Sequence, residues 1–182
     1  MLMRGNPDAV IAAVGADPIM PDIPGTDHPA VMLATDAFKE IERIGKKVVV
    51  IGGGQTGCET GLHLAFEGRE VTIVEMVDHL ALDAGFTYRN PLIERLDQNV
   101  TSLTGACCKK ITDQGVEIEN RNHDREEIKA DTVIVAVGMK PKRMESDQFQ
   151  DIAPEFFLIG DCEQAKNLKL AVRAGYYAAI QI

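Results

Sequence analysis

Short apolar runs recur along the chain, and their pattern predicts a parallel sheet. The runs contain almost no polar residues, so they lack the alternation of a strand with one wet face, and they cover residues 9–14, 48–51, 132–137 and 156–159. Such runs are typical of parallel strands that are covered on both faces. We expect two further strands, at residues 70–74 and 100–103.

Apolar residues at helical spacing predict the segments between these strands. Cys58, Leu62, Ala65 and Phe66 share one face of a helix that follows the 48–51 strand. We expect further helices at residues 35–44, 90–98 and 167–182, with extended or polar connectors at 16–29 and 140–154. The alternation of strand and helix indicates an α/β fold with a Rossmann-like, three-layer arrangement.

One region breaks this alternation. Residues 116–119 switch between apolar and charged side chains, which is typical of an antiparallel strand with one solvated face. Turn-forming clusters at 113–115 and 120–122 flank the segment. We therefore expect residues 106–130 to form a three-stranded antiparallel β-meander in place of a crossover helix.

Composition narrows the class of protein. The 182 residues carry a formal net charge of −9 and are 45% hydrophobic, which favours a globular protein and argues against a nucleic-acid or anionic-membrane surface. We find no membrane-spanning run and no signal-peptide pattern, and we expect a cytoplasmic protein. Cys58, Cys107, Cys108 and Cys162 lack metal-ligand spacing, so we expect free thiols and no metal site.

Candidate chemistry lies where the 48–51 strand ends. Gly52, Gly54 and Gly57 have the G-x-G-x-x-G spacing. The first glycine permits a tight turn, the second lets the backbone approach a pyrophosphate, and the third lets the helix pack close to the strand. Free N–H groups at the start of the helix then favour an anion. For a single copy of the motif, the alternative is a glycine-rich connector.

The context of the motif favours a dinucleotide. The next strand ends at Glu75, eighteen residues after Gly57. A carboxylate at this place can accept hydrogen bonds from both hydroxyls of an adenosine ribose. Glu75 would repel a 2′-phosphate, and residues 76–86 contain no Arg or Lys that could bind one. We therefore expect binding of NADH in preference to NADPH.

The whole pattern resembles the two-dinucleotide-binding flavoproteins of the pyridine nucleotide-disulfide oxidoreductase superfamily. Residues 9–18 and 23–25 are similar to a strand and its exit in the FAD domain, residues 47–138 to the inserted NAD(P)H domain, and residues 157–162 to the second FAD motif. The Gly160-Asp161-Cys162 ending and the helix around 171–175 are most similar to the C-terminal part of NADH:flavin oxidoreductases, the 2,4-dienoyl-CoA reductase and trimethylamine dehydrogenase group.

The resemblance implies three segments. Residues 1–45 and 139–182 would be partial FAD-domain segments, the second with a C-terminal helix, and residues 46–138 would be a Rossmann-like NAD(H)-binding domain. The family begins its FAD domain with a G-x-G-x-x-G of its own, whereas this sequence has one copy, between the two flavin segments. We therefore expect a fragment that binds NADH and needs the missing N-terminal part of the parent enzyme to retain FAD.

The resemblance also assigns roles to single residues, and it implies no catalytic side chain. The pyrophosphate would be held by Gly52, Gly53, Gly54, Gln55, Thr56 and Gly57, and the adenosine ribose by Glu75. Glu59, expected on the first turn of the helix, would lie near the nicotinamide, or would be an acid favoured by the helix dipole. Gly138 would line the floor of the site, or would be a simple strand-exit glycine. Asp161 would bind FAD in the complete enzyme, or would cap the last helix.

The implied function is to position NADH for hydride transfer to FAD, with the cofactors supplying the redox chemistry. A nucleotide-binding module without chemistry of its own, an NADH-dependent disulfide reductase-like enzyme and an S-adenosylmethionine methyltransferase stay open as alternatives. The adjacent Cys107 and Cys108 cannot easily close an unstrained disulfide, which argues against the reductase. The Gly160-Asp161-Cys162 ending and the meander argue against the methyltransferase.

Overall fold

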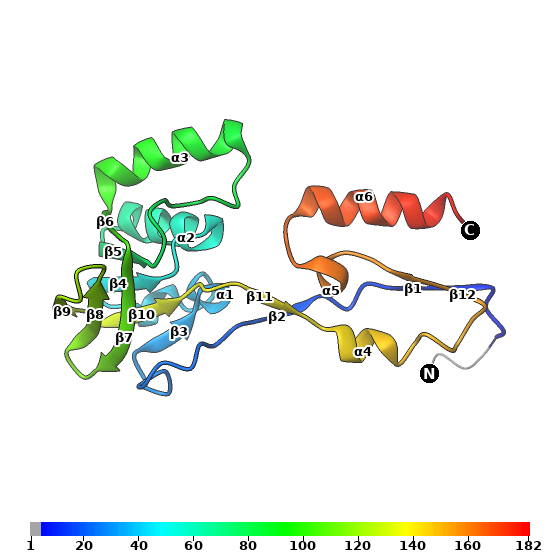
Figure 1. The fold of residues 1–182 in the computed structure, drawn as a ribbon, viewed down its shortest axis with the longest axis horizontal. Coiled ribbons are helices and arrows are strands. Elements are labelled where there is room, and N and C mark those ends of the chain that lie inside the picture. Colours follow the sequence, from blue (N-terminus) through cyan, green and yellow to red (C-terminus); the bar gives the residue numbers. More distant parts are fainter. Residues whose placement is uncertain (1–4) are drawn as a thin grey trace. The chain divides into compact units, whose positions relative to one another are not determined.

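A computed structural model describes residues 5–182, which divide into two units (Figure 1). The larger unit comprises residues 18–138, and the smaller unit combines residues 5–17 with residues 139–182. The chain passes between the units at β2 (Ala16–Pro18) and β11 (Met139–Pro141), which form a two-stranded sheet.

The larger unit is built on a five-stranded parallel sheet with the strand order β3-β10-β4-β5-β6. The strands are β3 (Val31–Leu33), β10 (Thr132–Val135), β4 (Lys47–Ile51), β5 (Glu70–Glu75) and β6 (Thr101–Thr104). The predicted α/β fold with a parallel sheet is confirmed. β4 is the middle strand, and its residues Val48, Val49 and Val50 are at most 1% exposed, as expected for a strand covered on both faces.

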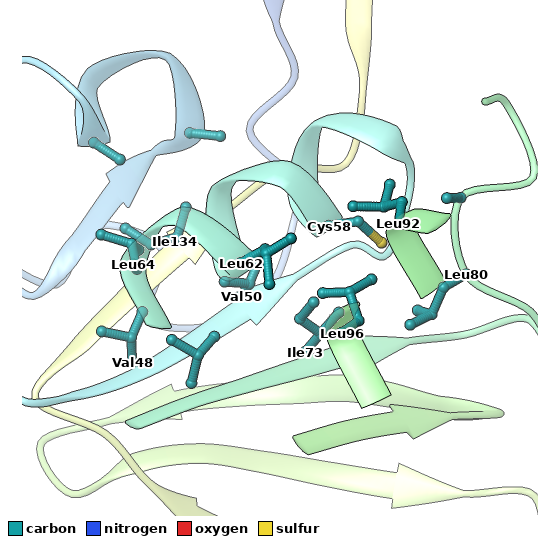
Figure 2. Close-up of a cluster of buried hydrophobic side chains, with 14 of the residues drawn as sticks. Val48, Val50, Cys58, Leu62, Leu64, Ile73, Leu80, Leu92, Leu96 and Ile134 are labelled. Carbon is teal, nitrogen blue, oxygen red and sulfur yellow. The ribbon is translucent and has the colours of Figure 1, made fainter. Parts of the chain in front are cut away.

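Helices cover one face of this sheet. They are α1 (Ala34–Ala37), the short 3-10 helix η1 (Ile41–Arg43), α2 (Gln55–Phe66) and α3 (Phe86–Asn99). Figure 2 shows the resulting cluster, in which Val50 and Ile73 from the sheet lie against Leu62 of α2 and Leu96 of α3. Alternate residues of each strand point to this side, so burial follows the two-residue period of a strand.

The meander covers the opposite face. Its strands are β7 (Ala106–Thr112), β8 (Gly115–Asn120) and β9 (Arg125–Lys129), and all neighbours are antiparallel. Val49 and Val74 from the parallel sheet form a second buried cluster with Val116 and Ile118 of β8. The meander predicted at residues 106–130 is therefore the third layer of the unit.

The smaller unit contains one pair of parallel strands, β1 (Ala9–Ala12) and β12 (Glu155–Leu158). Its helices are α4 (Arg143–Asp147), α5 (Asp161–Gln164) and α6 (Leu168–Ala179). The side chain of Asn167 caps α6 by accepting a hydrogen bond from the Leu170 N–H at 3.1 Å. The predicted strands and last helix of this region are thus present, with shifted ends.

Two predicted segments and the surroundings of one residue, Phe66, differ from what the sequence suggested. The helix expected at residues 35–44 is divided into α1 and η1; Ala37 and Ile44 are buried, so the apolar spacing reflects packing on the sheet and not a continuous helix. Phe66 is 59% exposed although it lies one turn after the buried Leu62, because it is the last residue of α2. The polar segment 140–154 contains β11 and α4 instead of an irregular linker.

Candidate dinucleotide-binding site

The glycine bend, residues 52–57, joins the end of β4 to α2. Gly52 has a φ of +104°, and a Cβ there would lie 2.5 Å from the Ala136 carbonyl oxygen. A Cβ on Gly57 would lie 1.9 Å from the carbonyl oxygen of Gly52. Glycine is therefore required at both positions. A Cβ on Gly54 would meet nothing closer than the Asp83 carboxylate at 3.5 Å, so the bend has an open side there.

Glu75 ends β5 and turns its carboxylate back toward the bend. Its Oε2 accepts a hydrogen bond from the Gly53 N–H at 2.6 Å, and its Oε1 accepts one from the Val77 N–H at 2.9 Å. An ionised carboxylate has about four acceptor positions. Two of them are used here, so the group retains the capacity to accept hydrogen bonds from two further hydroxyls.

The start of α2 combines one capped amide with free amides. Asp83, which lies 28 residues further along the chain, accepts a hydrogen bond from the Gln55 N–H at 2.7 Å. It caps a helix whose own N-cap residue, Gly54, has no side chain to do so. Within residues 5–182, the amides of Gly54 and Thr56 donate to no acceptor. These N–H groups lie at the positive end of the helix, where an anion is favoured.

Glu59 lies one turn further along α2 than expected. Because the helix begins at Gln55, Glu59 is its fifth residue and belongs to the second turn. The Gln55 side-chain amide donates to Glu59 Oε1 at 2.8 Å. Tyr88, from α3, lies beside Glu59, and its interaction with this carboxylate raises the pKa of Tyr88. The helix dipole acts mainly within the first turn, so side-chain partners hold this carboxylate. The sequence contained no signal for Tyr88.

Cys58 is a buried thiol that supports the bend. It is fully buried, and its thiol donates to the Gly53 carbonyl oxygen at 3.3 Å. Burial raises its pKa to about 12, with additional contributions from the carboxylates of Asp83, Glu75 and Glu59. The thiol is therefore protonated at neutral pH. All four cysteines of the chain are free.

Gly138 lies at the same edge of the sheet as the bend. It follows β10, whose Val135 pairs with Ile51 of β4 directly before Gly52. Its φ is +112°, and its carbonyl oxygen accepts a hydrogen bond from the Ile19 N–H at 3.0 Å. The positive φ favours glycine, and the bond ties the strand exit to the connector at its side.

Arg121 brings a cation to this edge that sequence reasoning missed. It lies between β8 and β9 and forms an ion pair with Asp78, three residues after Glu75. Residues 76–86 contain no Arg or Lys, but Arg121 lies beside this segment in the fold. Nothing in the sequence pairs position 121 with position 78, because their contact depends on how the meander packs on the sheet.

Asp161 belongs to the smaller unit and lies beside a hollow of about 470 Å³. Its neighbour Gly160 has a φ of +69°, and Ala13, Gly15 and Lys166 also line the hollow. Asp161 Oδ1 accepts a hydrogen bond from the Lys166 N–H at 3.4 Å. The alternative that Asp161 caps the last helix is wrong, because Asn167 caps α6.

Within residues 5–182, no group of three or more His, Cys, Asp or Glu side chains is arranged to hold a metal ion. In the same range, no helix combines the length and the apolar character that crossing a membrane requires.

Known proteins similar to this chain are longer oxidoreductases. It is 36% identical over 181 residues to a bilirubin reductase of Mediterraneibacter gnavus, covering 98% of this chain and 28% of the relative. It is 32% identical over 183 residues to an NADH oxidase of Thermoanaerobacter brockii, covering 97% of this chain and 28% of the relative. The chain thus spans little more than a quarter of these relatives.

Solved structures and the family match agree with the sequence resemblance. A 2-naphthoyl-CoA reductase in complex with 2-naphthoyl-CoA superimposes with a TM-score of 0.89 at 32% identity, over 97% of this chain and 27% of that one. A histamine dehydrogenase from Rhizobium sp. 4-9 shares the fold with a TM-score of 0.77 at 18% identity, over 96% of this chain and 30% of that one. Residues 6–178 match the family described as pyridine nucleotide-disulphide oxidoreductase. The chain therefore belongs to this family, whose members depend on FAD and NAD(P).

Proposed function

We propose that the chain binds NADH at the glycine bend and positions it for hydride transfer to FAD within a longer flavin-dependent oxidoreductase. Family membership supports the general class of activity. The preference for NADH, the roles of single residues and the activity of the complete protein belong to the proposal.

The proposal rests on one observation, the free amides at the glycine bend. The N–H groups of Gly54 and Thr56 have no acceptor within the described residues, and the Glu75 carboxylate is directed at the same bend. A diphosphate at the start of α2 would satisfy both amides and profit from the helix dipole. Glu75 would then accept hydrogen bonds from the adenosine ribose, as the acid of a dinucleotide fingerprint does.

We place the nicotinamide end of the nucleotide near Glu59 and Gly138. Glu59 is held in position by Gln55 and Tyr88, so its carboxylate is pre-oriented to accept a hydrogen bond from the bound cofactor. When bound, NADH supplies the hydride. The contribution of this chain is to orient the nucleotide.

The FAD site is only partly supplied by this chain. Asp161 and Gly160 line a hollow in the smaller unit, which fits a role in holding the flavin nucleotide. The sequence has no second G-x-G-x-x-G to bind the FAD pyrophosphate. We therefore propose that FAD binding requires the remainder of the parent enzyme, and that the isolated chain is a nucleotide-binding module.

The proposed domain division needs one refinement. We keep residues 46–138 as the NAD(H)-binding domain and residues 1–45 and 139–182 as flavin-domain segments. However, β3, at residues 31–33, pairs with β10 and extends the parallel sheet of the larger unit. This pairing favours a structural role for β3 in the NAD(H) domain.

A disulfide reductase is disfavoured as the alternative. Cys107 and Cys108 are adjacent on β7, and successive side chains of a strand point to opposite faces. Cys58 and Cys162 are fully buried. Among the four free thiols, these positions offer no exposed pair that could exchange with a disulfide substrate.

Calorimetric titrations with NADH, NADPH and FAD in parallel test the proposal. We expect measurable NADH binding, weaker NADPH binding and little or no FAD binding. Glu75→Arg should lower the NADH/NADPH affinity ratio by at least about tenfold, because it removes a repulsive charge and adds a phosphate-binding one. Glu70→Arg, at the other end of β5, is the matched control. An unchanged ratio in Glu75→Arg would refute this role of Glu75, and binding of S-adenosylmethionine without NADH would refute the proposal.

A further inference from the structure

The ion pair between Arg121 and Asp78 is held in a defined place. The Arg121 side chain lies along Gly105, where a Cβ would be 2.8 Å from its Nε, 3.3 Å from its Cδ and 3.4 Å from its Cγ. Gly105 also has a φ of +65°, so its backbone and the close approach of the arginine both favour glycine. The two charged side chains remain accessible, at 60% and 55% exposure.

The turn that carries Arg121 is also well ordered by hydrogen bonds. Asn120 Oδ1 accepts from the N–H groups of Asn122 and Asp124 at 2.9 and 3.0 Å. The Asn120 N–H donates to the Asp124 carbonyl oxygen at 3.0 Å. A side chain that closes its own turn restricts the backbone on either side. The backbone that carries the Arg121 side chain is therefore restricted.

This ion pair lies next to the acid proposed to bind the ribose. Glu75 pairs across β5 and β6 with Thr104, the residue before Gly105. The Gly105 N–H donates to the Val77 carbonyl oxygen at 3.0 Å, and the Val77 N–H donates to Glu75 at 2.9 Å. Asp78 and Arg121 are thus linked to Glu75 along the chain and across the strands.

We propose that Asp78 is a specificity-determining residue that withholds Arg121 from a 2′-phosphate. This inference rests on the proposed NADH site and deepens it. A 2′-phosphate is attached to the ribose hydroxyl that Glu75 would bind, so it extends toward the residues that follow Glu75. A guanidinium is the preferred partner of such a group. Here Asp78 already pairs with the Arg121 guanidinium. Glu75 would therefore exclude a 2′-phosphate by charge repulsion, and Asp78 would exclude it by occupying the cation that could bind it.

A set of isosteric variants tests this assignment. Glu75→Gln serves as background, because the amide oxygen can still accept from Gly53 while the repulsive charge is removed. Addition of Asp78→Asn should raise the affinity for adenosine 2′,5′-bisphosphate about tenfold, with little change for 5′-AMP. The same gain is expected for NADPH, and it should shrink as salt is added. Further addition of Arg121→Ala should abolish it.

Arg125→Ala is the matched control, because Arg125 lies at the start of β9 and pairs with Glu119. It should leave the gain intact. The inference is overturned if NADH and 5′-AMP bind normally but Asp78→Asn gives no gain, or if the gain survives removal of Arg121. If neither NADH nor 5′-AMP binds to the wild-type chain, the proposed function fails and this inference fails with it.

Discussion

β4 of the larger unit and β1 of the smaller unit come from similar apolar runs but have different surroundings. Four of the five residues of β4 are buried, whereas in β1 only Ala12 is buried and Ile11 is 43% exposed. β4 has helices on one face of its sheet and the meander on the other. An apolar run therefore predicts a strand, while its burial depends on the layers that cover it.

The glycine and acid positions of the two units also differ in how closely they are packed. A Cβ on Gly57 would lie 1.9 Å from backbone, whereas a Cβ on Gly160 would have its nearest neighbour, Ala171, at 3.7 Å. The bend is closely packed and has its acid, Glu75, bonded to it. Asp161 lies beside an open hollow. The larger unit thus has a closely packed bend with an acid bonded to it, whereas the smaller unit has an acid beside an open hollow.

The largest effect expected from this comparison concerns one isoleucine in each unit. Ile73 of β5 is fully buried, so Ile73→Ala should lower the free energy of unfolding by about 2–5 kcal/mol. Ile11→Ala should cost less than about 1 kcal/mol, because Ile11 is 43% exposed. Denaturant unfolding that is monitored by hydrogen exchange in each strand measures both changes in the free energy of unfolding. Equal costs would show that the two units are equally well packed.

The next effect tests the close packing of the bend. Gly57→Ala should cost about 3 kcal/mol, because the added Cβ would force the Gly52 carbonyl to move. NADH affinity should fall more than about tenfold as the bend shifts. Gly85→Ala is the control, since its Cβ would meet nothing within 4 Å and its φ is −61°. A Gly57→Ala chain with unchanged stability would contradict the described geometry.

The smallest expected effects distinguish two roles of Asp83, the capping of α2 and the negative charge near the bend. Asp83→Ala should lower the free energy of unfolding by about 1 kcal/mol, because the Gln55 N–H loses its acceptor. Asp83→Asn keeps an acceptor and removes a negative charge near the proposed phosphate position. It should therefore raise NADH affinity about threefold at low salt, with little change in stability. Asp97→Asn on α3 is the matched control, and a loss of NADH affinity in Asp83→Asn would contradict this account.

Local patterns in the sequence were sufficient for most of the fold. Apolar runs and the alternation at 116–119 predicted the parallel sheet and the meander. These predictions succeeded because the periods of strands and helices can be read from residues that are close together in the sequence. The continuous helix expected at 35–44 was wrong, and Phe66 is exposed although it shares the predicted helix face. Helix ends and burial are decided by tertiary packing.

The sequence by itself determined the family, the bend and the acid that follows the next strand. Only the tertiary structure brought Asp83 to Gln55, Tyr88 to Glu59 and Arg121 to Asp78. Each of these contacts joins residues more than twenty-five positions apart. Which residues meet depends on how loops and layers pack on the sheet, and the local periodicity of the sequence contains no information about this packing.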